Sequence, residues 1–172
     1  MLPRFTPDDA QSAWERWGCN CGPTALAVMA GATLDEVRPH LSGFDGKRYT
    51  NPTMMFGALK SIGLSFNRIG AAWPRYGLAR IQWEGPWTQP GVPMRARYRF
   101  THWVASWMTE TRGHGIYDCN AMTPGSNGWC RLVDWEQVIV PMIVETIPRA
   151  SGKWHVTHGI EVPTPDLRLE AA

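Results

Sequence analysis

The sequence of 172 residues lacks any apolar run long enough to span a bilayer, and it lacks internal repeats and low-complexity segments. Its first residues contain no apolar run behind a basic region, so no secretory signal is expected. These absences predict a protein with no membrane partner and a cytoplasmic location. Packaging in a virion or export by a dedicated machine would leave the same features, so virion association stays open.

An excess of charge of one sign is also missing. The 17 Lys and Arg residues nearly balance the 15 Asp and Glu residues, which leaves a formal net charge of +2. So small an imbalance argues against nucleic acid or an anionic membrane as the main partner. The sequence does not indicate an oligomeric state.

Cysteine is sparse, and its spacing is informative. Only Cys19, Cys21, Cys119 and Cys130 are present, and without an export signal free thiols are expected rather than a disulfide framework. A zinc site made from these cysteines and His114 is not favoured, because Cys-x-Cys departs from the usual spacing and no second chelating pair exists. We therefore expect no metal and no cofactor.

The sequence has the composition of a single globular domain, residues 1–172, with 44% hydrophobic and 19% charged residues. Helices are expected over residues 10–17, 22–30, 33–41, 52–61 and 134–139. Strands are expected over residues 65–69, 79–83, 94–107, 115–119 and 154–162. Residues typical of helix ends mark the boundaries: Asp8 or Asp9, Thr33 and Asp134 as caps, Gly31 and Gly63 as ends, Pro141 as a break. Helices followed by an antiparallel sheet indicate an α+β fold.

A thiol stands directly before the clearest helix. Cys21 precedes Gly22 and Pro23, and proline suits the first turn of a helix. Unpaired N–H groups and the helix dipole favour a thiolate there, and the thiolate is the attacking species in thiol catalysis. A small buried cysteine that begins a core helix is the structural alternative.

The segment from Cys21 to Ala27, Cys-Gly-Pro-Thr-Ala-Leu-Ala, resembles the Cys-Gly-Pro-Ala-Ala-Leu-Ala start of peptidase family C39 and its C39-like relatives. That resemblance implies a papain-like cysteine protease fold, with N-terminal helices packed on an antiparallel β-sheet. It also makes Cys21, rather than Cys19, the nucleophile.

A histidine and a carboxylate follow at a suitable separation. His102 lies in a predicted strand, and Asp118 lies in the strand that returns after a polar turn. A hairpin centred near Glu110 would place His102 directly opposite Asp118, within reach of a hydrogen bond. Glycines in the turn would shift its centre and make the pairing diagonal. The resemblance implies His102 as base and Asp118 as its orienter, with Asn120 as the alternative orienter.

The oxyanion-hole donor does not match the family pattern. Relatives usually carry a glutamine six residues before the nucleophile, where this sequence has Glu15. Gln11, one helical turn earlier, and Asn20, next to Cys21, are the candidate donors. Losing one such donor typically costs about a hundredfold in rate.

The predicted function is that of a cysteine hydrolase cleaving peptide or isopeptide bonds in a peptide or protein substrate, through a thioester intermediate. Two alternatives stay open: a weak or inactive module with a binding or structural role, for example in a phage or prophage, and an amidase or acyltransferase with the same triad. Arg95, Arg97 and Arg99 alternate like one face of a strand. They are either a solvated face or a basic rim that selects acidic substrate or phosphate.

Overall fold

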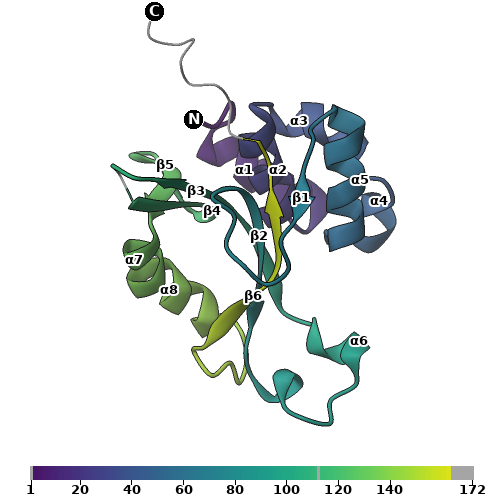
Figure 1. The fold of residues 1–172 in the computed structure, drawn as a ribbon, viewed down its shortest axis with the longest axis vertical. Helices are drawn as coiled ribbons and strands as arrows, with labels where there is room; N and C mark the ends of the chain where they lie inside the picture. The colour runs from purple at the N-terminus through teal and green to yellow at the C-terminus, as the bar shows by residue number, and fades with distance from the viewer. Residues whose placement is uncertain (1, 112, 164–172) are drawn as a thin grey trace, which may run out of the picture.

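The computed structural model describes residues 2–111 and 113–163 and has the α+β organisation that the sequence predicts (Figure 1). Six strands form one antiparallel sheet in the order β1-β6-β2-β3-β4-β5. The strands are β1 (Asn67–Arg68), β2 (Tyr76–Trp83), β3 (Thr101–Thr109), β4 (Gly113–Thr123), β5 (Ser126–Arg131) and β6 (Trp154–Glu161).

Five α-helices precede the sheet, and short helical turns interrupt or follow it. The first group is α1 (Pro7–Trp17), α2 (Cys21–Ala30), α3 (Leu34–Val37) with η1 (Arg38–His40), α4 (Phe44–Lys47) and α5 (Pro52–Ile62). The later ones are η2 (Pro86–Thr88), α6 (Met94–Arg97), α7 (Leu132–Asp134), the π-helical η3 (Trp135–Ile139) and α8 (Val140–Glu145). No helix in the described part of the chain has the length and apolar character needed to cross a bilayer.

The expected helix ends are confirmed at three glycine or threonine positions. Gly31 and Gly63 end α2 and α5 in the left-handed conformation that glycine adopts without strain, and Thr33 caps α3. The cap of α1 is Thr6 instead of Asp8 or Asp9. Asp9 serves as the reciprocal partner in the capping box, because its carboxylate accepts from the Thr6 backbone N–H.

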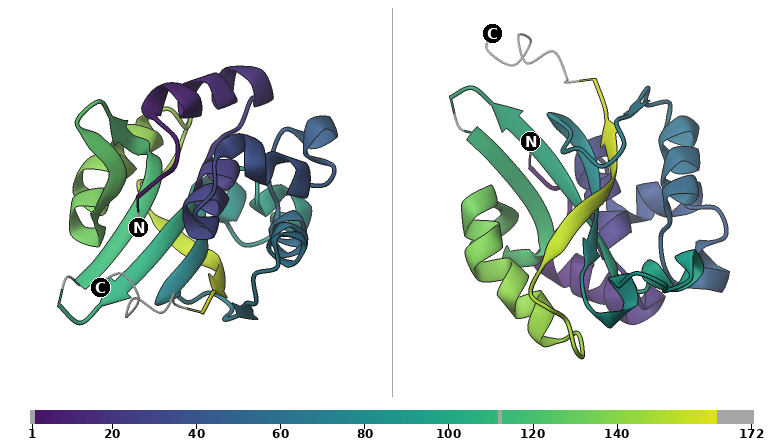
Figure 2. Two further views of the ribbon diagram at one scale, coloured as in Figure 1. Left: turned by 90° about the horizontal axis from the view of Figure 1, so that it is seen from above. Right: turned by 60° about the horizontal axis from the view of Figure 1, so that its bottom comes forward.

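Helices cover both faces of the sheet (Figure 2), and the sheet separates two apolar clusters. On one face α1 to α5 pack against alternate strand residues such as Leu78, Trp103 and Ala105. On the other face η3 and α8 pack against the intervening residues, among them Val104. Because successive strand side chains point to opposite faces, neighbouring residues of β3 belong to different clusters. The central strands β2 and β3 are therefore buried on both sides.

The strand expected over residues 94–107 is wrong in its first half. Residues 94–97 form α6, and β3 begins only at Thr101. The pairing between β2 and β3 ends at Gln82–Thr101, and one more bond, from the Trp83 N–H to the Phe100 carbonyl at 3.1 Å, follows it, so residues 94–97 lie beyond the ladder. The regular alternation of arginines there is consequently not a strand face.

Two further expectations fail between β4 and β6. Strand β5 was not expected, because its Asn127-Gly128 sequence has little strand propensity, and it forms by pairing with β4. Asp134 does not cap a helix: α7 begins earlier, and the Asp134 carboxylate receives two hydrogen bonds from Arg131. Pro141 does not end the helical run, because η3 continues directly into α8, but the hydrogen bonding changes from π-helical to α-helical beside it.

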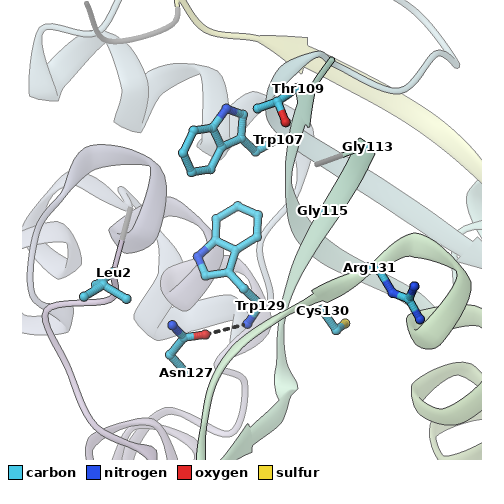
Figure 3. Close-up of a pocket in the computed structure, with 9 residues that line it drawn as sticks. All are labelled: Leu2, Trp107, Thr109, Gly113, Gly115, Asn127, Trp129, Cys130 and Arg131. Carbon is cyan, nitrogen blue, oxygen red and sulfur yellow. Dashed lines mark hydrogen bonds between the residues drawn. The ribbon is translucent and has the colours of Figure 1, made fainter. Parts of the chain in front are cut away.

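A pocket of about 360 Å³ lies at the Thr109 end of β3 (Figure 3). Its walls include Trp107 and Trp129, whose rings meet edge to face, and Cys130. The Trp129 backbone N–H donates to Asn127 Oδ1 at 3.1 Å. This pocket contains no carboxylate among the described residues that line it.

Candidate active site

A second cleft, of about 510 Å³, lies between the N-terminal helices and the opposite end of β3. It brings together five residues that sequence analysis selected from distant positions. They are Gln11, Asn20, Cys21, His102 and Asn120. Its other described lining residues are Trp14, Gly18, Cys19, Arg48, Trp83, Arg99, Phe100, Thr101, Ile143, Thr146 and Ile147.

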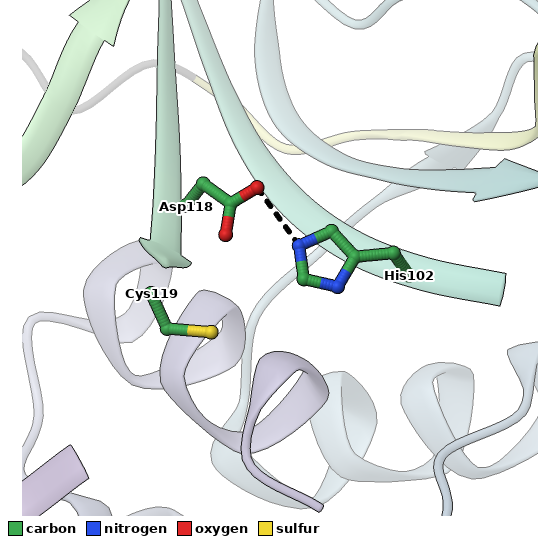
Figure 4. Close-up of side chains that lie close together, drawn as sticks. All are labelled: His102, Asp118 and Cys119. Carbon is green, nitrogen blue, oxygen red and sulfur yellow. Dashed lines mark hydrogen bonds and ion pairs between the residues drawn. The ribbon is translucent and has the colours of Figure 1, made fainter. Parts of the chain in front are cut away.

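Asp118 lies behind His102 and holds its ring. His102 Nε2 and Asp118 Oδ2 are 2.9 Å apart, and both side chains are buried (Figure 4). An ionised carboxylate accepts only, so His102 Nε2 carries the proton in this contact. Nδ1, on the other side of the ring, is left to accept a proton from a group in the cleft.

The hairpin places this pair diagonally instead of directly opposite each other. The β3–β4 pairs run from Thr109–Gly113 to Ala105–Tyr117, so the turn is centred one residue later than Glu110. Continued along the strands, this register sets His102 opposite Asn120. The 2.9 Å contact with Asp118 is therefore made between diagonal neighbours, which side chains of this length can bridge.

The Asp118 carboxylate receives hydrogen bonds on both oxygens. Trp135 Nε1 donates to Oδ2 at 2.8 Å, the same oxygen that receives His102. The backbone N–H and the side-chain amide of Asn120 both donate to Oδ1, each at 2.9 Å. Asn120, the alternative orienter, thus directs its hydrogen bonds to Asp118, which in turn holds the His102 ring.

These contacts outweigh the cost of burial for both charges. Burial opposes ionisation of Asp118, but the His102 charge and the donated hydrogen bonds hold the pKa of the carboxyl below its usual value. Burial likewise opposes protonation of His102, and the Asp118 charge raises the pKa of the imidazole above its usual value. The pair is therefore arranged to support an imidazolium in the cleft.

Cys21 is the first residue of α2, and its sulfur lies 3.9 Å from the sulfur of Cys19. The hydrogen bond from Cys21 lowers the pKa of Cys19 to about 7, against the effect of burial. The same contact, together with burial, raises the pKa of Cys21. The two thiols therefore give up a first proton readily and a second one with difficulty, because one S–H stabilises the other thiolate.

The glycine that follows Cys21 is required by packing. A Cβ at Gly22 would collide with the Thr50 side chain, so only glycine lets the start of α2 approach that loop. The Thr50 carbonyl in turn accepts a hydrogen bond from the Trp103 indole, 3.2 Å away. Thr50 thus connects the start of α2, which packs on its side chain, with Trp103 of β3, the residue after His102.

Both candidate oxyanion donors line the cleft, and each already makes one hydrogen bond. Gln11 Nε2 donates to Glu15 Oε1 at 2.9 Å. Asn20 Nδ2 donates to the Ala10 carbonyl at 2.9 Å, and Asn20 Oδ1 lies 3.6 Å from Cys119 Sγ. An amide nitrogen has two N–H groups, so one remains in each case. Gln11 is on the exposed side of α1, whereas Asn20 is tied to the helix start.

A metal could be held only at the expense of this network. In the described chain, potential ligand atoms of His102, Asp118 and Cys119 lie within 4.8 Å of one another. Both Asp118 oxygens already accept hydrogen bonds, and burial raises the pKa of the Cys119 thiol. The donor set therefore suits proton transfer better than ligation. The set imagined from the sequence, with Cys130 and His114, is not brought together.

Several residues of the site were not found from the sequence. Trp135 had no signal linking it to Asp118, because the contact spans two elements. Cys19 was set aside on the motif, yet its sulfur is adjacent to that of Cys21. Arg48 lines the cleft in the left-handed conformation, with φ of 53°. No sequence pattern predicts that a loop residue of this kind belongs to the site.

Comparisons with protein-family models, curated proteins and solved structures found no match to this chain.

Proposed function

We propose that this protein is a thiol hydrolase of papain-like, C39-like type that cleaves peptide or isopeptide bonds. The observation that carries the proposal is the buried hydrogen bond between His102 Nε2 and Asp118, beside a cysteine at a helix start in the same cleft. A histidine held through Nε2 keeps Nδ1 for a thiol proton, as nucleophile activation requires.

In the proposed mechanism His102 Nδ1 takes the proton of Cys21, and the thiolate attacks the acyl carbon. The imidazolium then gives this proton to the leaving amine, so that a thioester remains on Cys21. Water, deprotonated by His102, attacks the thioester, and the thiol is restored as the acid leaves. Asp118 keeps the ring oriented and stabilises its positive charge.

The proposed oxyanion hole combines the backbone N–H of Cys21 with the free N–H of Gln11. The first N–H groups of a helix have no partner within the helix. The N–H of Cys21 hydrogen-bonds to the Cys19 sulfur, a position that the oxyanion would take over in the reaction. Gln11 is preferred over Asn20, because its longer side chain lies on the exposed side of the cleft. An amidase or acyltransferase would use the same groups and differ only in the acceptor.

The test is alkylation by iodoacetamide between pH 5 and 9, with mass spectrometry to locate the adduct. The expected result is fast labelling of the Cys19–Cys21 pair near neutral pH that slows in His102→Ala, because the two thiols share one readily lost proton. A peptide mixture is then incubated with the wild type and with Cys21→Ala, and new termini are sought. Labelling that is no faster than that of an ordinary thiol and is unchanged in His102→Ala would contradict the hydrolase function and favour a non-catalytic binding module.

Cys19 is the control for the identity of the nucleophile. Both sulfurs lie in the cleft, and alkylation alone does not separate a nucleophile from its neighbour. If Cys19→Ala retains peptide cleavage and Cys21→Ala loses it, the assignment to Cys21 stands. The reverse result would transfer the role to Cys19 and retain the reaction type.

A further inference from the structure

The charge around the cleft is unbalanced. Arg48 and Arg99 come from separate segments, after α4 and after α6, and both line the cleft. Among the described lining residues none is acidic. The two nearest carboxylates do not line the cleft: Asp118 lies behind His102, and Glu15 accepts a hydrogen bond from Gln11. The open side of the cleft therefore presents guanidinium groups to whatever enters.

Neither arginine is neutralised by the part of the chain that the structure describes. Arg48 and Arg99 form no ion pair there, although six other pairs of charged groups do. The Arg99 guanidinium lies 5.4 Å from the Phe100 ring centroid, which orients it without neutralising it. Planar guanidinium groups with unused donors suit carboxylate oxygens, which they can bind through two parallel hydrogen bonds.

Arg48 is held in place in spite of backbone strain. Its φ of 53° is a conformation that favours glycine, yet an arginine stands there, as the C-cap of α4. Its aliphatic chain passes over Gly18, since Arg48 Cδ lies 3.6 Å from where a Cβ of that glycine would be. Gly18 directly precedes Cys19, so the arginine is placed against the segment that carries both thiols.

A third guanidinium, that of Arg80, adds positive charge at the side of the cleft formed by Thr101. Arg80 on β2 is only 6% exposed, and its Nε has no hydrogen-bond partner among the described residues. Its Nη2 donates to Thr101 Oγ1 at 3.1 Å, and Thr101 lines the cleft next to His102. Walls of low dielectric strengthen such a field inside a cleft.

We propose that the cleft takes peptide substrates with a carboxylate beside the scissile bond, and that Arg48 and Arg99 are the specificity-determining residues. This inference rests on the hydrolase function proposed above. The carboxylate is either an Asp or Glu side chain or a free C-terminus, since both present the same group to a guanidinium.

The first experiment uses two reagents with the same reacting carbon and different charge, iodoacetate and iodoacetamide. The rate of iodoacetate divided by the rate of iodoacetamide at the cleft thiols is measured for the wild type, Arg48→Gln, Arg99→Gln and the double variant. We expect the ratio to fall by about threefold to tenfold in the double variant and less in each single one. Added salt is expected to reduce the wild-type ratio.

Arg95→Gln is the matched control, because Arg95 lies on α6 close to Arg99 and lines the adjoining pocket that Arg99 also borders, but not the cleft. It removes the same charge and is expected to leave the ratio unchanged. A ratio that is equal in wild type and double variant, or that falls as much in Arg95→Gln, overturns the inference. The ratio is measurable even when labelling is slow, so this result does not depend on catalysis.

The second experiment distinguishes the two sources of the carboxylate. Synthetic peptide pools with Asp and Glu, or with Asn and Gln in their place, are offered with free and with amidated C-termini. Cleavage beside Asp or Glu that weakens in the double variant supports side-chain recognition, and cleavage lost only on amidation supports a C-terminus. Equal cleavage of all pools would contradict the proposed specificity but not the hydrolase function. Labelling that does not depend on His102, together with no cleavage, would contradict the hydrolase function itself.

Discussion

The two ends of strand β3 each hold a histidine contact, and they differ in where the proton lies. At the Thr101 end, His102 donates from Nε2 to the Asp118 carboxylate and keeps Nδ1 as an acceptor. Toward the Thr109 end, Ser106 Oγ lies 2.8 Å from His114 Nε2 and donates its own proton to the Pro74 carbonyl. A hydroxyl has one proton to give, so His114 must be the donor to Ser106.

The second pair therefore resembles a serine–histidine dyad in composition and cannot act as one in this arrangement. Burial lowers the pKa of His114, and no carboxylate contacts its ring in the described structure. Burial also raises the pKa of Cys130, at this end of the sheet, to about 11, whereas that of Cys19 is lowered to about 7. The pKa of Cys19 is lowered because the Cys21 thiol hydrogen-bonds to it, whereas burial dominates at Cys130, so the neighbouring groups rather than the residue type set the pKa of each thiol.

The largest expected effect separates the cysteines of the two ends. Cys21→Ala is expected to reduce peptide cleavage by about 10⁴-fold or more, since it removes the nucleophile. Cys130→Ala, whose thiol stays protonated near neutral pH, is expected to retain it. Product formation by both variants is measured by mass spectrometry, and equal losses would mean that the cleft is not the site.

The next effect separates the histidines. His102→Ala is expected to slow alkylation of the cleft thiols at pH 7 by roughly tenfold to a hundredfold, because the imidazolium that favours the thiolate is lost. His114→Ala removes a histidine whose ring hydrogen-bonds to Ser106 and packs on Trp73, outside the cleft lining, and is expected to leave the rate unchanged. Matching rate losses in both variants would indicate a general loss of structure.

A third prediction concerns stability. Asp118→Asn is expected to lower the free energy of unfolding by about 3 kcal/mol, because an amide turns N–H groups toward donors that the carboxylate accepted. Since the folded-state pKa of Asp118 is below its ordinary value of 3.8, this contribution is present above that pH and is lost as pH falls through the folded value.

Urea unfolding at several pH values measures this difference. The control is Asp134→Asn, which replaces an exposed carboxylate at the other end of the sheet and is expected to unfold close to the wild type. A stability loss for Asp118→Asn that stays constant from pH 7 down to pH 3 would contradict the assignment of an ionised Asp118.

The smallest effect is expected within the thiol pair. Cys19→Ala removes the contact that raises the pKa of Cys21, so Cys21 is expected to alkylate at lower pH than in the wild type. Cys21→Ala removes the contact that lowers the pKa of Cys19, so the Cys19 profile is expected to move upward from about 7. Profiles that shift in the same direction in both variants would show that the thiols do not share a proton.

Local sequence signals foretold the elements that place the site, and failed where an element depends on its neighbour. Gly31 and Gly63 stop α2 and α5 as expected, because glycine adopts the left-handed conformation without a partner's help. Residues 94–97 and β5 were misassigned, because a strand forms only where another strand offers hydrogen bonds. A diagonal contact of His102 and Asp118 was predicted for a turn centred later than Glu110, and the β3–β4 register has its turn one residue later.

The sequence by itself determined the α+β order, the start of α2 at Cys21, and the two residues of the hairpin whose side chains meet. These depend on caps, turns and periodicity, which act over a few residues. Only the tertiary structure decided that Trp135 and Asn120 share Asp118, that Cys19 faces Cys21, and that two unpaired arginines border the cleft. The cleft that these groups share is lined by residues from Gln11 to Ile147, so packing of distant segments, not local sequence, decides which groups meet there.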